Sequence, residues 1–490
     1  MLKSSYRISY CLLAALLAAC SNSESQATAR SQAAPVREPD SDPASASAQP
    51  DVLIITIDTL RHDFLSCYGF PRTTTPTIDA LAGGGALFEQ HRTVISLTLP
   101  AHTSLFSGFH PAEHGSRRNS HLVDPAIPLI AERFHAAGYR TAAYVGSTVL
   151  SSRRGLARGF ETYDDEMPSD ARRIGASKEF FERDASAVVE RAIEAVKSDD
   201  PRPLFLWMHL FDPHEPYTAP NEQQRASEAS RAIHSAAVEP SEIVSAERQL
   251  KHRLGYEAEV RHVDAMLGKF FEHWDGRARG RSALVVVTAD HGQGLGEHDY
   301  TGHGFRLYEE QLRVPFVLRM RGRVPAGARV SAQTSAIDVA ATVLDLARIA
   351  DVSGFGGSSL SAHLDGTLAA TSASYAERRE WLETDVQRVG EVRGLLEKLS
   401  GRAGATRGDQ YALVDGRWKY IWSAGVLHEC FDLETDPREA NNLVERQLED
   451  ARALRARLEL WHASIRLRAG SPTVSDEDEE TQRALQALGY

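Results

Sequence analysis

Three runs of uninterrupted apolar residues, rich in valine, isoleucine and leucine, dominate the hydrophobic pattern of this chain. They cover residues 51–57, 204–211 and 283–289. A strand that is buried on both faces shows no polar alternation, so these runs predict central strands of a parallel sheet. Segments with apolar residues at helical spacing lie between the runs, at 129–137, 177–196 and 256–274. The alternation predicts an α/β fold in which helices flank a large, mostly parallel central sheet.

Each of these three strands ends at charged residues. Asp58 follows the first, Asp212 and His214 follow the second, and Asp290-His291 follows the third. Open α/β sheets bind ligands at the carboxyl ends of their strands, so these side chains predict one site. Carboxylate and imidazole ligands together suit zinc, manganese or another borderline divalent ion. Taken alone, Asp58 is as readily explained as a cap of the segment that follows it. Its position opposite Asp290 in the same sheet favours a role as metal ligand.

A candidate nucleophile precedes a short predicted helix. Pro100 near the start and Gly108 at the end bracket this helix, which places Thr98 at or just before its amino terminus. A hydroxyl there faces free backbone N–H groups and the positive end of the helix dipole. An isolated threonine at this position is most simply an N-cap. Beside metal ligands it becomes a candidate nucleophile, whose proton a bound ion helps to remove.

Several other polar residues are assigned structural roles. His209 lies within its apolar run and is interpreted as a core histidine. Arg61 and Arg313 are expected to form structural ion pairs. Cys67 and Cys430 either form one disulfide or remain buried and unpaired, because their distance in sequence says nothing about their distance in space.

Composition limits the classes of function. The chain has 490 residues, of which 42% are hydrophobic, enough for one large α/β domain with a smaller companion. Its formal net charge is -12, without the basic clusters that mark nucleic-acid binding. No nucleic-acid partner is therefore expected.

Residues 1–20 resemble the signal peptide of a bacterial lipoprotein. Two basic residues precede an apolar run at 10–19, which is too short for an ordinary transmembrane helix. The run ends in Leu-Ala-Ala-Cys20, a sequence similar to a lipobox, so Cys20 is the expected lipidation site; a plain secretory signal is the alternative. Residues 21–50, rich in Ser, Ala, Pro and Gln, predict a flexible linker. The expected location is the bacterial cell envelope, on the periplasmic or cell-surface side, with the membrane reached through the lipid anchor.

Beyond this leader, the motifs resemble the sulfatase branch of the alkaline phosphatase superfamily. The resembling segments are 57–61, 98–108, 211–217, 290–298 and 307–315. Segments 418–421 and 430–437 are similar to the small carboxyl-terminal subdomain of that family. The resemblance implies a catalytic domain over 51–348, a small C-terminal α/β subdomain over 349–470 and a terminal helical tail over 471–490.

The nucleophile segment departs from the usual sulfatase pattern. Sulfatases carry Cys or Ser in the frame Cys/Ser-x-Pro-x-Arg, and that first residue is oxidised to formylglycine. Here the frame is Thr98-Leu-Pro100-Ala-His102, and Thr59 stands where many members have a second metal-binding aspartate. Threonine cannot give the aldehyde, so no formylglycine is expected.

A threonine nucleophile resembles the phosphodiesterase-type members of the superfamily. Their ligand order is matched here by Asp58, Thr98, Asp212 with His214, Asp290 with His291, and His303. The resemblance implies that one or two divalent ions, calcium, zinc or manganese, are held by Asp58, Thr98, Asp290, His291, Asp212 and His303. Asp212 and His214 are two residues apart where four is usual, which leaves open that His214 and His303 contact the substrate anion beside a single ion.

The implied catalytic residues are Thr98, His102 and His214. Thr98 would attack the ester, His102 would help to neutralise charge on the ester oxygens, and His214 would act at the leaving oxygen. We expect a metal-dependent hydrolase of sulfate or phosphate esters of small molecules, glycans or lipids.

Three alternatives remain open. They are a phosphodiesterase or phosphonate monoester hydrolase, a phospho-group transferase of the same superfamily, and a catalytically inert binding lipoprotein. Intact metal ligands argue against the last, since unpaired buried carboxylates are costly to retain without an ion.

Overall fold

The computed structural model of the chain describes residues 49–167, 172–173, 181–239, 244–277, 282–364, 372–379, 408–423, 427–446 and 449–465. The predicted signal peptide with Cys20, the predicted linker up to residue 48 and the predicted tail at 471–490 lie outside these residues. Within the described ranges, no helix combines the length and apolar character needed to cross a bilayer.

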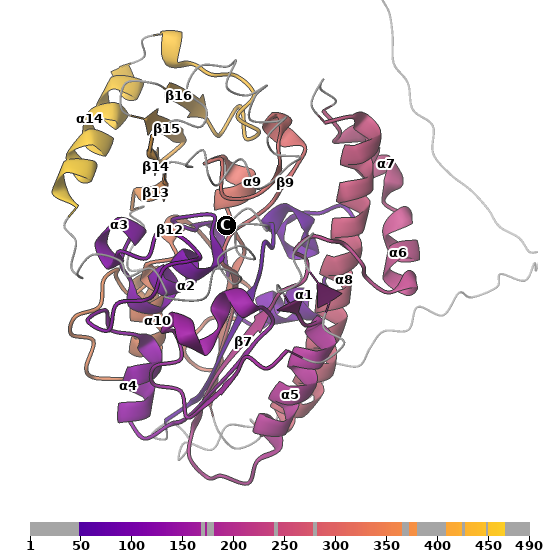
Figure 1. Cartoon of the computed structure of the whole chain (residues 1–490), viewed down its shortest axis with the longest axis vertical. Helices are drawn as coiled ribbons and strands as arrows, with labels where there is room; N and C mark the ends of the chain where they lie inside the picture. The colour runs from indigo at the N-terminus through magenta and orange to yellow at the C-terminus, as the bar shows by residue number, and fades with distance from the viewer. Residues whose placement is uncertain are drawn as a thin grey trace, which may run out of the picture. The chain divides into compact units, whose positions relative to one another are not determined.

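An eight-stranded sheet forms the centre of the described chain (Figure 1), in the order β12-β2-β11-β8-β1-β7-β3-β4. Its strands are β1 (Asp51–Ile57), β2 (Ala86–Arg92), β3 (Arg140–Val145), β4 (Thr162–Asp164), β7 (Leu204–Leu210), β8 (Ala283–Ala289), β11 (Phe316–Met320) and β12 (Ala328–Ser335). The strands from β8 to β4 are parallel, and β11 runs antiparallel to both of its neighbours. The mostly parallel sheet is confirmed, and the three apolar runs are its central strands.

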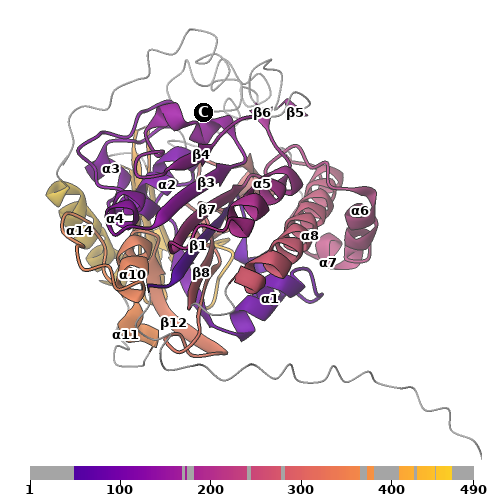
Figure 2. The same cartoon turned by 90° about the horizontal axis from the view of Figure 1, so that it is seen from below.

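Alternate residues of β1 enter different hydrophobic cores because successive side chains of a strand point to opposite faces. Val52 and Ile54 belong to one core, and Leu53 and Ile55 to the other. The first core packs against α2 (Thr98–Ser107), α4 (Ile130–Ala136) and α10 (Asp338–Leu346). The second packs against α1 (Pro76–Gly83), α5 (Ala185–Lys197) and α8 (Ala246–Arg277). Figure 2 shows these two groups of helices on opposite sides of the strands.

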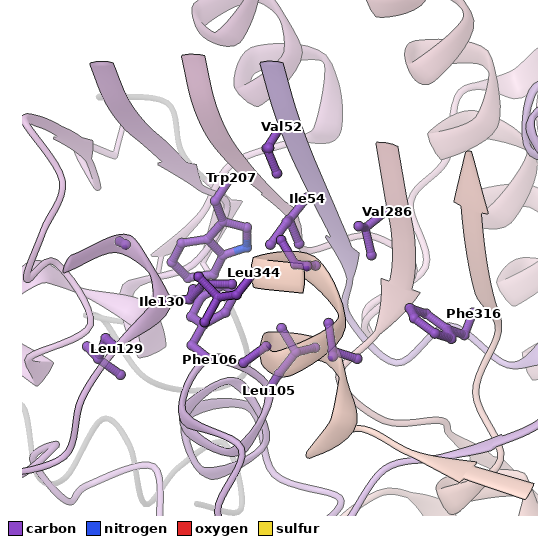
Figure 3. Packing of buried hydrophobic residues seen from close by; sticks show 14 of the residues in the cluster. Val52, Ile54, Leu105, Phe106, Leu129, Ile130, Trp207, Val286, Phe316 and Leu344 are labelled. Carbon is purple, nitrogen blue, oxygen red and sulfur yellow. The ribbon is translucent and has the colours of Figure 1, made fainter. Parts of the chain in front are cut away.

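Aromatic side chains fill the first core. Figure 3 shows Trp207 and Phe316 on the strands facing Phe106 and Leu344 on the helices. The rings of Phe106 and Trp207 meet edge to face, with their centroids 4.7 Å apart. This packing holds α2, and therefore its first residue, against the sheet.

Helix α8 begins ten residues before the predicted start at residue 256. Its first half is polar, so apolar spacing did not reveal it. Gln249 and Arg253 are nevertheless buried there. Gln249 donates to the carbonyls of Glu239 and Val244, so polar contacts replace the missing apolar face. The other predicted helices correspond to α4 and to α5, which begins at Ala185.

The C-terminal part forms a second, antiparallel sheet of β13 (Ser374–Arg378), β14 (Gln410–Asp415), β15 (Trp418–Ser423) and β16 (Leu427–Asp432). One face packs on Leu307, Tyr308 and Leu312, around α9 (Glu309–Leu312). The other face packs on α14 (Glu449–Ser464). In Figure 1, α9 and α14 accordingly lie on opposite sides of this sheet.

Shorter elements complete the described chain. The helices are α3 (Pro111–His114), α6 (Asn221–Glu228), α7 (Arg231–Ala236) and α11 (Ser361–Leu364). Two small strand pairs are β5 (Arg172–Arg173) with β6 (Phe181–Glu182) and β9 (Gly294–Leu295) with β10 (Thr301–Gly302). Single 3₁₀ turns occur at His62–Phe64, Ser66–Tyr68, Thr148–Leu150, Ser152–Arg154, Glu297–Asp299 and Val444–Arg446.

Cys67 is half-buried and Cys430 is buried, and both thiols are free, so no disulfide joins them.

Candidate active site

The strand register brings the predicted acidic residues to one edge of the sheet. Ile57, the last residue of β1, lies beside Ala289 of β8 and Leu210 of β7. The next residues along β1 and β8 are Asp58 and Asp290. The two carboxylates therefore meet at the carboxyl end of the central strands, as expected for an open α/β sheet.

Asp58, Asp290 and His291 form a compact donor set. Their ligand atoms lie within 4.8 Å of one another, and each side chain is at most 1% exposed. Asp58 Oδ1, Asp290 Oδ2 and His291 Nε2 have no hydrogen-bond partner among the described residues. Nδ1 of His291 faces the carbonyl of Gly292 at 3.0 Å and therefore carries the proton, which leaves the Nε2 lone pair free. This oxygen and nitrogen set fits a divalent cation.

The electrostatics of the two carboxylates also fit a cation. Burial and the neighbouring charge of Asp290 raise the pKa of Asp58 well above its usual value, more than the Thr98 hydroxyl lowers it. No lysine or arginine of the described chain forms an ion pair with either carboxylate; the titratable side chains within 4 Å of them are histidines. Two adjacent buried carboxylates resist being ionised together unless a positive charge joins them.

Thr98 is the first residue of α2, as predicted, and is fully buried. Its hydroxyl donates to Oδ2 of Asp58 at 3.3 Å. Leu97, immediately before it, is extended, so the chain turns into the helix at the hydroxyl. Thr98 therefore faces the carboxylate pair from the positive end of the helix.

Asn119 was missed by sequence reasoning because it belongs to no motif and lies in a loop. Its Oδ1 accepts from the backbone N–H of Leu99 at 2.8 Å, next to the candidate nucleophile. Its Nδ2 is buried and has no partner in the described part of the chain. The amide thus places an uncommitted donor beside Thr98.

Both ring nitrogens of His102, which is predicted to help neutralise charge on the ester oxygens, lie close to groups of the protein. Its Nδ1 lies 2.8 Å from the carbonyl oxygen of Thr98, and its Nε2 lies 2.9 Å from the hydroxyl of Thr56. Burial lowers the pKa of His102, more than the charge of Asp290 raises it, so the ring is neutral. Both ring nitrogens of His102 therefore have hydrogen-bond partners within the protein, which argues against a charged contact with substrate.

His209 is buried, as expected of a core histidine, but its ring faces the site. Nε2 lies 3.4 Å from Oδ2 of Asp58, and Nδ1 lies 3.3 Å from the backbone nitrogen of Gly146. The interpretation as an ordinary core residue is wrong in this respect. An imidazole within an apolar run looks the same in sequence whether it faces a core or a carboxylate.

His214 and His303 come together as a pair, with their Nε2 atoms 3.1 Å apart. Nδ1 of His214 faces the carbonyl of Glu215 at 2.7 Å, and Nδ1 of His303 faces the carbonyl of Ser96 at 3.2 Å. Carbonyls only accept, so in the neutral rings both Nδ1 atoms carry the protons and the two Nε2 lone pairs face each other. A shared proton or a cation between them would satisfy both. The ring of His303 is 4.5 Å from that of His291, which ties the pair to the carboxylate cluster.

Asp212, predicted as a metal ligand, contacts the start of α5. Its Oδ2 accepts from the backbone N–H of Ala185 at 2.8 Å. The clusters of three potential ligands that the described residues form do not include Asp212. This carboxylate therefore anchors a helix end to the strand that precedes the His214 loop.

The two arginines assigned to structure differ in their partners. Arg61 forms ion pairs with Asp63 at 2.8 Å and with Glu297 at 2.9 Å, so its predicted role is confirmed. Arg313 instead donates from Nε and a terminal nitrogen to the backbone carbonyl of Glu89. Its role is structural, but this partner is a carbonyl where a carboxylate was expected.

The profile of the sulfatase family matches residues 50–349, more than half of the chain. The chain belongs to the sulfatase family. It is 25% identical over 417 residues to the ulvan-active sulfatase of Formosa agariphila, covering 81% of this chain and 77% of that protein. It is 23% identical over 456 residues to the choline-sulfatase of Rhizobium meliloti, covering 81% and 83%.

The family fold extends to solved structures. The phosphonate monoester hydrolase of Agrobacterium radiobacter superposes with a TM-score of 0.66 at 22% identity, covering 85% of this chain and 95% of that chain. The shared α/β fold, with its small C-terminal sheet, confirms the fold class predicted from the sequence. The match to the sulfatase family over residues 50–349 confirms the family that the motifs resemble.

Proposed function

We propose that this protein is a metal-dependent hydrolase of sulfate esters in which Thr98 is the nucleophile. The observation that carries the proposal is the Thr98 hydroxyl, 3.3 Å from Asp58 and directed at the carboxylate cluster from the start of a helix. Sulfatase relatives named for ulvan and for choline support a glycan or small-molecule sulfate ester as substrate.

Asp58, Asp290 and His291 would hold the ion, because they present the unpartnered oxygen and nitrogen atoms of the site. A bound divalent cation supplies a Lewis acid that stabilises negative charge on the attacking oxygen and on the ester. The candidate ions are calcium, zinc and manganese, which mass spectrometry of the purified protein distinguishes.

Thr98 attacks the sulfur, and the ester oxygen leaves from the opposite side. The hydroxyl proton lies along the bond to Asp58, so this carboxylate is its first acceptor. The free Nδ2–H of Asn119 supplies a donor for the non-bridging oxygens as charge develops on them, and the positive end of the α2 dipole stabilises the same charge. Water then attacks the sulfur of the sulfated Thr98, which releases sulfate and returns a proton to the threonine oxygen.

The His214–His303 pair is suited to the leaving oxygen. The two facing Nε2 atoms are satisfied by one proton or by a second cation, and either would neutralise an alkoxide as it leaves. Burial lowers the pKa of His214 to about 4, which makes the shared proton costly near neutral pH and favours a cation. The number of bound ions distinguishes these cases.

A phosphonate monoester or phosphodiester hydrolase is the second candidate function. Threonine at the nucleophile position favours it, because the aldehyde chemistry of formylglycine is excluded. The fold is also shared with the phosphonate monoester hydrolase of Agrobacterium radiobacter. A panel of esters decides between the two functions.

We further infer that the chain is anchored in the bacterial cell envelope through lipid on Cys20. The lipobox-like Leu-Ala-Ala-Cys20 supports this inference, and residues 21–50 would serve as the tether. Metabolic labelling with a fatty acid should mark the wild-type chain and leave Cys20→Ala unlabelled. Labelling of both proteins, or of neither, would exclude the anchor.

The test is a joint measurement of metal content and turnover. Residues 21–490 are purified, bound metal is counted by mass spectrometry, and an aryl sulfate, a phosphate monoester, a phosphate diester and a phosphonate are assayed. We expect Thr98→Ala to lower sulfate release by at least about 10³-fold with unchanged metal content. Thr103→Ala is the matched control, since Thr103 lies in the same helix and its hydroxyl donates to the carbonyl of Leu99.

Each other outcome excludes part of the proposal. Full activity in Thr98→Ala removes this residue as nucleophile. Turnover of diesters or phosphonates without sulfate release supports the second candidate, and neither metal nor turnover leaves an inert binding protein. Transfer of the covalent group to an added alcohol in place of water would indicate a transferase.

A further inference from the structure

Two buried histidines outside the predicted metal set, His102 and His209, lie against the Thr98–Asp58 pair. Neither side chain has any exposed surface, and their ring centroids are 5.0 Å apart. Ligand atoms of the two histidines and Asp290 lie within 4.8 Å of one another, a spacing compatible with a metal site. The hydrogen bonds of each ring decide whether it can bind an ion.

The proton of His102 lies on Nδ1. This nitrogen is 2.8 Å from the carbonyl of Thr98, which accepts and cannot donate. Thr56 Oγ1 already accepts from the indole N–H of Trp207 at 2.9 Å, so its own proton is free to reach Nε2 of His102. A chain of bonds therefore runs from Trp207 through Thr56 and His102 to the backbone of Thr98, and no ring nitrogen is left for a metal.

The proton of His209 lies on the other nitrogen. The backbone N–H of Gly146 can only donate, so Nδ1 of His209 must accept and be unprotonated. In the neutral ring the proton is then on Nε2, 3.4 Å from Oδ2 of Asp58. Nε2 of His209 makes no hydrogen bond within the described part of the chain. A nitrogen that carries a proton cannot ligate a metal, but at this distance a small movement of the ring lets it donate to the carboxylate.

We propose that His209 and His102 are positioning residues of opposite tautomer, which hold Asp58 and Thr98 in place and bind no ion themselves. His209 orients the carboxylate that accepts from the Thr98 hydroxyl, and His102 orients the backbone of Thr98. The geometry of the nucleophile is thus set by two neutral rings behind it. This inference rests on the proposed function for its catalytic consequence, but the tautomers are independent of that function.

The direct test is the tautomeric state of the histidines in the metal-free, wild-type protein. Two-bond proton–nitrogen correlation spectra of ¹⁵N-histidine-labelled protein distinguish Nδ1–H from Nε2–H. We expect His102 as the Nδ1–H tautomer and His209 as the Nε2–H tautomer, assigned from the signals lost in His102→Gln and His209→Gln. A protonated Nδ1 on His209, or a protonated Nε2 on His102, would overturn the proposal. This test holds whether or not the enzyme is a sulfatase.

Two variants test the consequence for the site. His209→Phe keeps a ring among Trp207, Phe211 and His102 but removes the donor. Loss of such a supporting bond typically costs about 10–100-fold in metal affinity or activity. We therefore expect His209→Phe to weaken binding of titrated Mn²⁺ or Zn²⁺ and to lower kcat with little change in KM.

His209→Gln is the conservative partner of this variant, because its side-chain amide can place an N–H near the same point. It should recover part of the lost metal affinity and kcat. Equal loss in both variants, or a change confined to melting temperature, would show that His209 only fills space. Failure of the whole enzyme to turn over any ester would leave the metal titration and the tautomers as independent readouts.

Discussion

Two groups of buried charged residues differ in how their charges are balanced. The first is the site cluster of Asp58, Asp290 and His291. The second, here called the α9 charge cluster, consists of Arg92, Glu309, Lys419 and Glu439. Lys419 contacts Glu309 at 3.1 Å and Glu439 at 2.8 Å, and Arg92 contacts Glu309 at 2.8 Å. The α9 charge cluster contains as many cations as anions, whereas the site cluster contains no lysine or arginine.

Burial is nearly complete in both clusters, yet the pKa values of Asp58 and Glu309 move in opposite directions. In the site cluster, burial and the charge of Asp290 raise the pKa of Asp58. In the α9 charge cluster, burial alone would raise the pKa of Glu309, but Arg92 and Lys419 hold it well below its usual range. Buried carboxylates that are compensated by the protein are structural, and those left without a cation indicate a place for one.

Removal of a cation from the α9 charge cluster should have the largest effect on stability. Lys419→Met leaves two buried glutamates with Arg92 alone. Breaking a buried pair in this way typically costs about 3–5 kcal/mol, which urea unfolding would measure. The double variant Lys419→Met with Glu439→Gln restores the balance of charge and should recover much of this loss. A loss below about 1 kcal/mol in the single variant would show that the cluster is solvated in solution.

Removal of a charge from the site cluster should have the opposite sign in metal-free protein. Asp58→Asn abolishes the repulsion with Asp290, so we expect a gain of about 1–3 kcal/mol without metal. The same variant should lose the stabilisation that added Mn²⁺ or Zn²⁺ gives to wild type. Asp63→Asn is the control, because the Arg61 guanidinium lowers the pKa of Asp63 and the change should therefore destabilise.

The pH dependence of metal-free protein sharpens the same contrast. A raised pKa means that folded protein binds more protons than unfolded protein. Stability should therefore fall as pH rises above the unfolded aspartate value of about 4, through the raised pKa of Asp58. Asp58→Asn should flatten this fall. If the pH dependence of stability is the same in Asp58→Asn as in wild type, the repulsion involves other groups than Asp58.

His298 lies beside the α9 charge cluster and should have the smallest effect. Its ring nitrogens face Oε1 of Glu310 at 3.2 Å and the carbonyl of Glu439 at 3.3 Å. Burial lowers the pKa of His298, but Glu310 outweighs it and raises the pKa to about 9. The stabilisation should be complete below the unfolded value of about 6.5 and be lost as pH rises through about 9.

The measurement for His298 is the free energy of unfolding across this pH window. His298→Gln should remove about 1 kcal/mol at low pH and nothing at high pH, since the ion pair is partly solvated. A loss that is the same at both ends of the window would mean that the ring acts through packing on Tyr308 and not through its charge.

The central sheet and the principal site residues were predictable because their signals are local. Strands buried on both faces must be apolar at every position, so 51–57, 204–211 and 283–289 were evident. The residues that follow such strands in an α/β sheet lie at its ligand-binding edge, which indicated Asp58 and Asp290. Pro100 near the start and Gly108 at the end indicated the short helix that begins at Thr98.

The partners of each polar atom were decided by the tertiary structure alone. His209 acquires its role from Gly146 and Asp58, which lie 63 and 151 residues away in the chain. Asn119 lies beside Thr98 because its side chain accepts from the backbone N–H of Leu99. Asp212 accepts from the first residue of α5 and is not among the clustered ligands of the described residues. Apolar periodicity is a property of neighbouring residues, whereas a tautomer or the sign of a pKa shift depends on groups that only packing brings within a few ångströms.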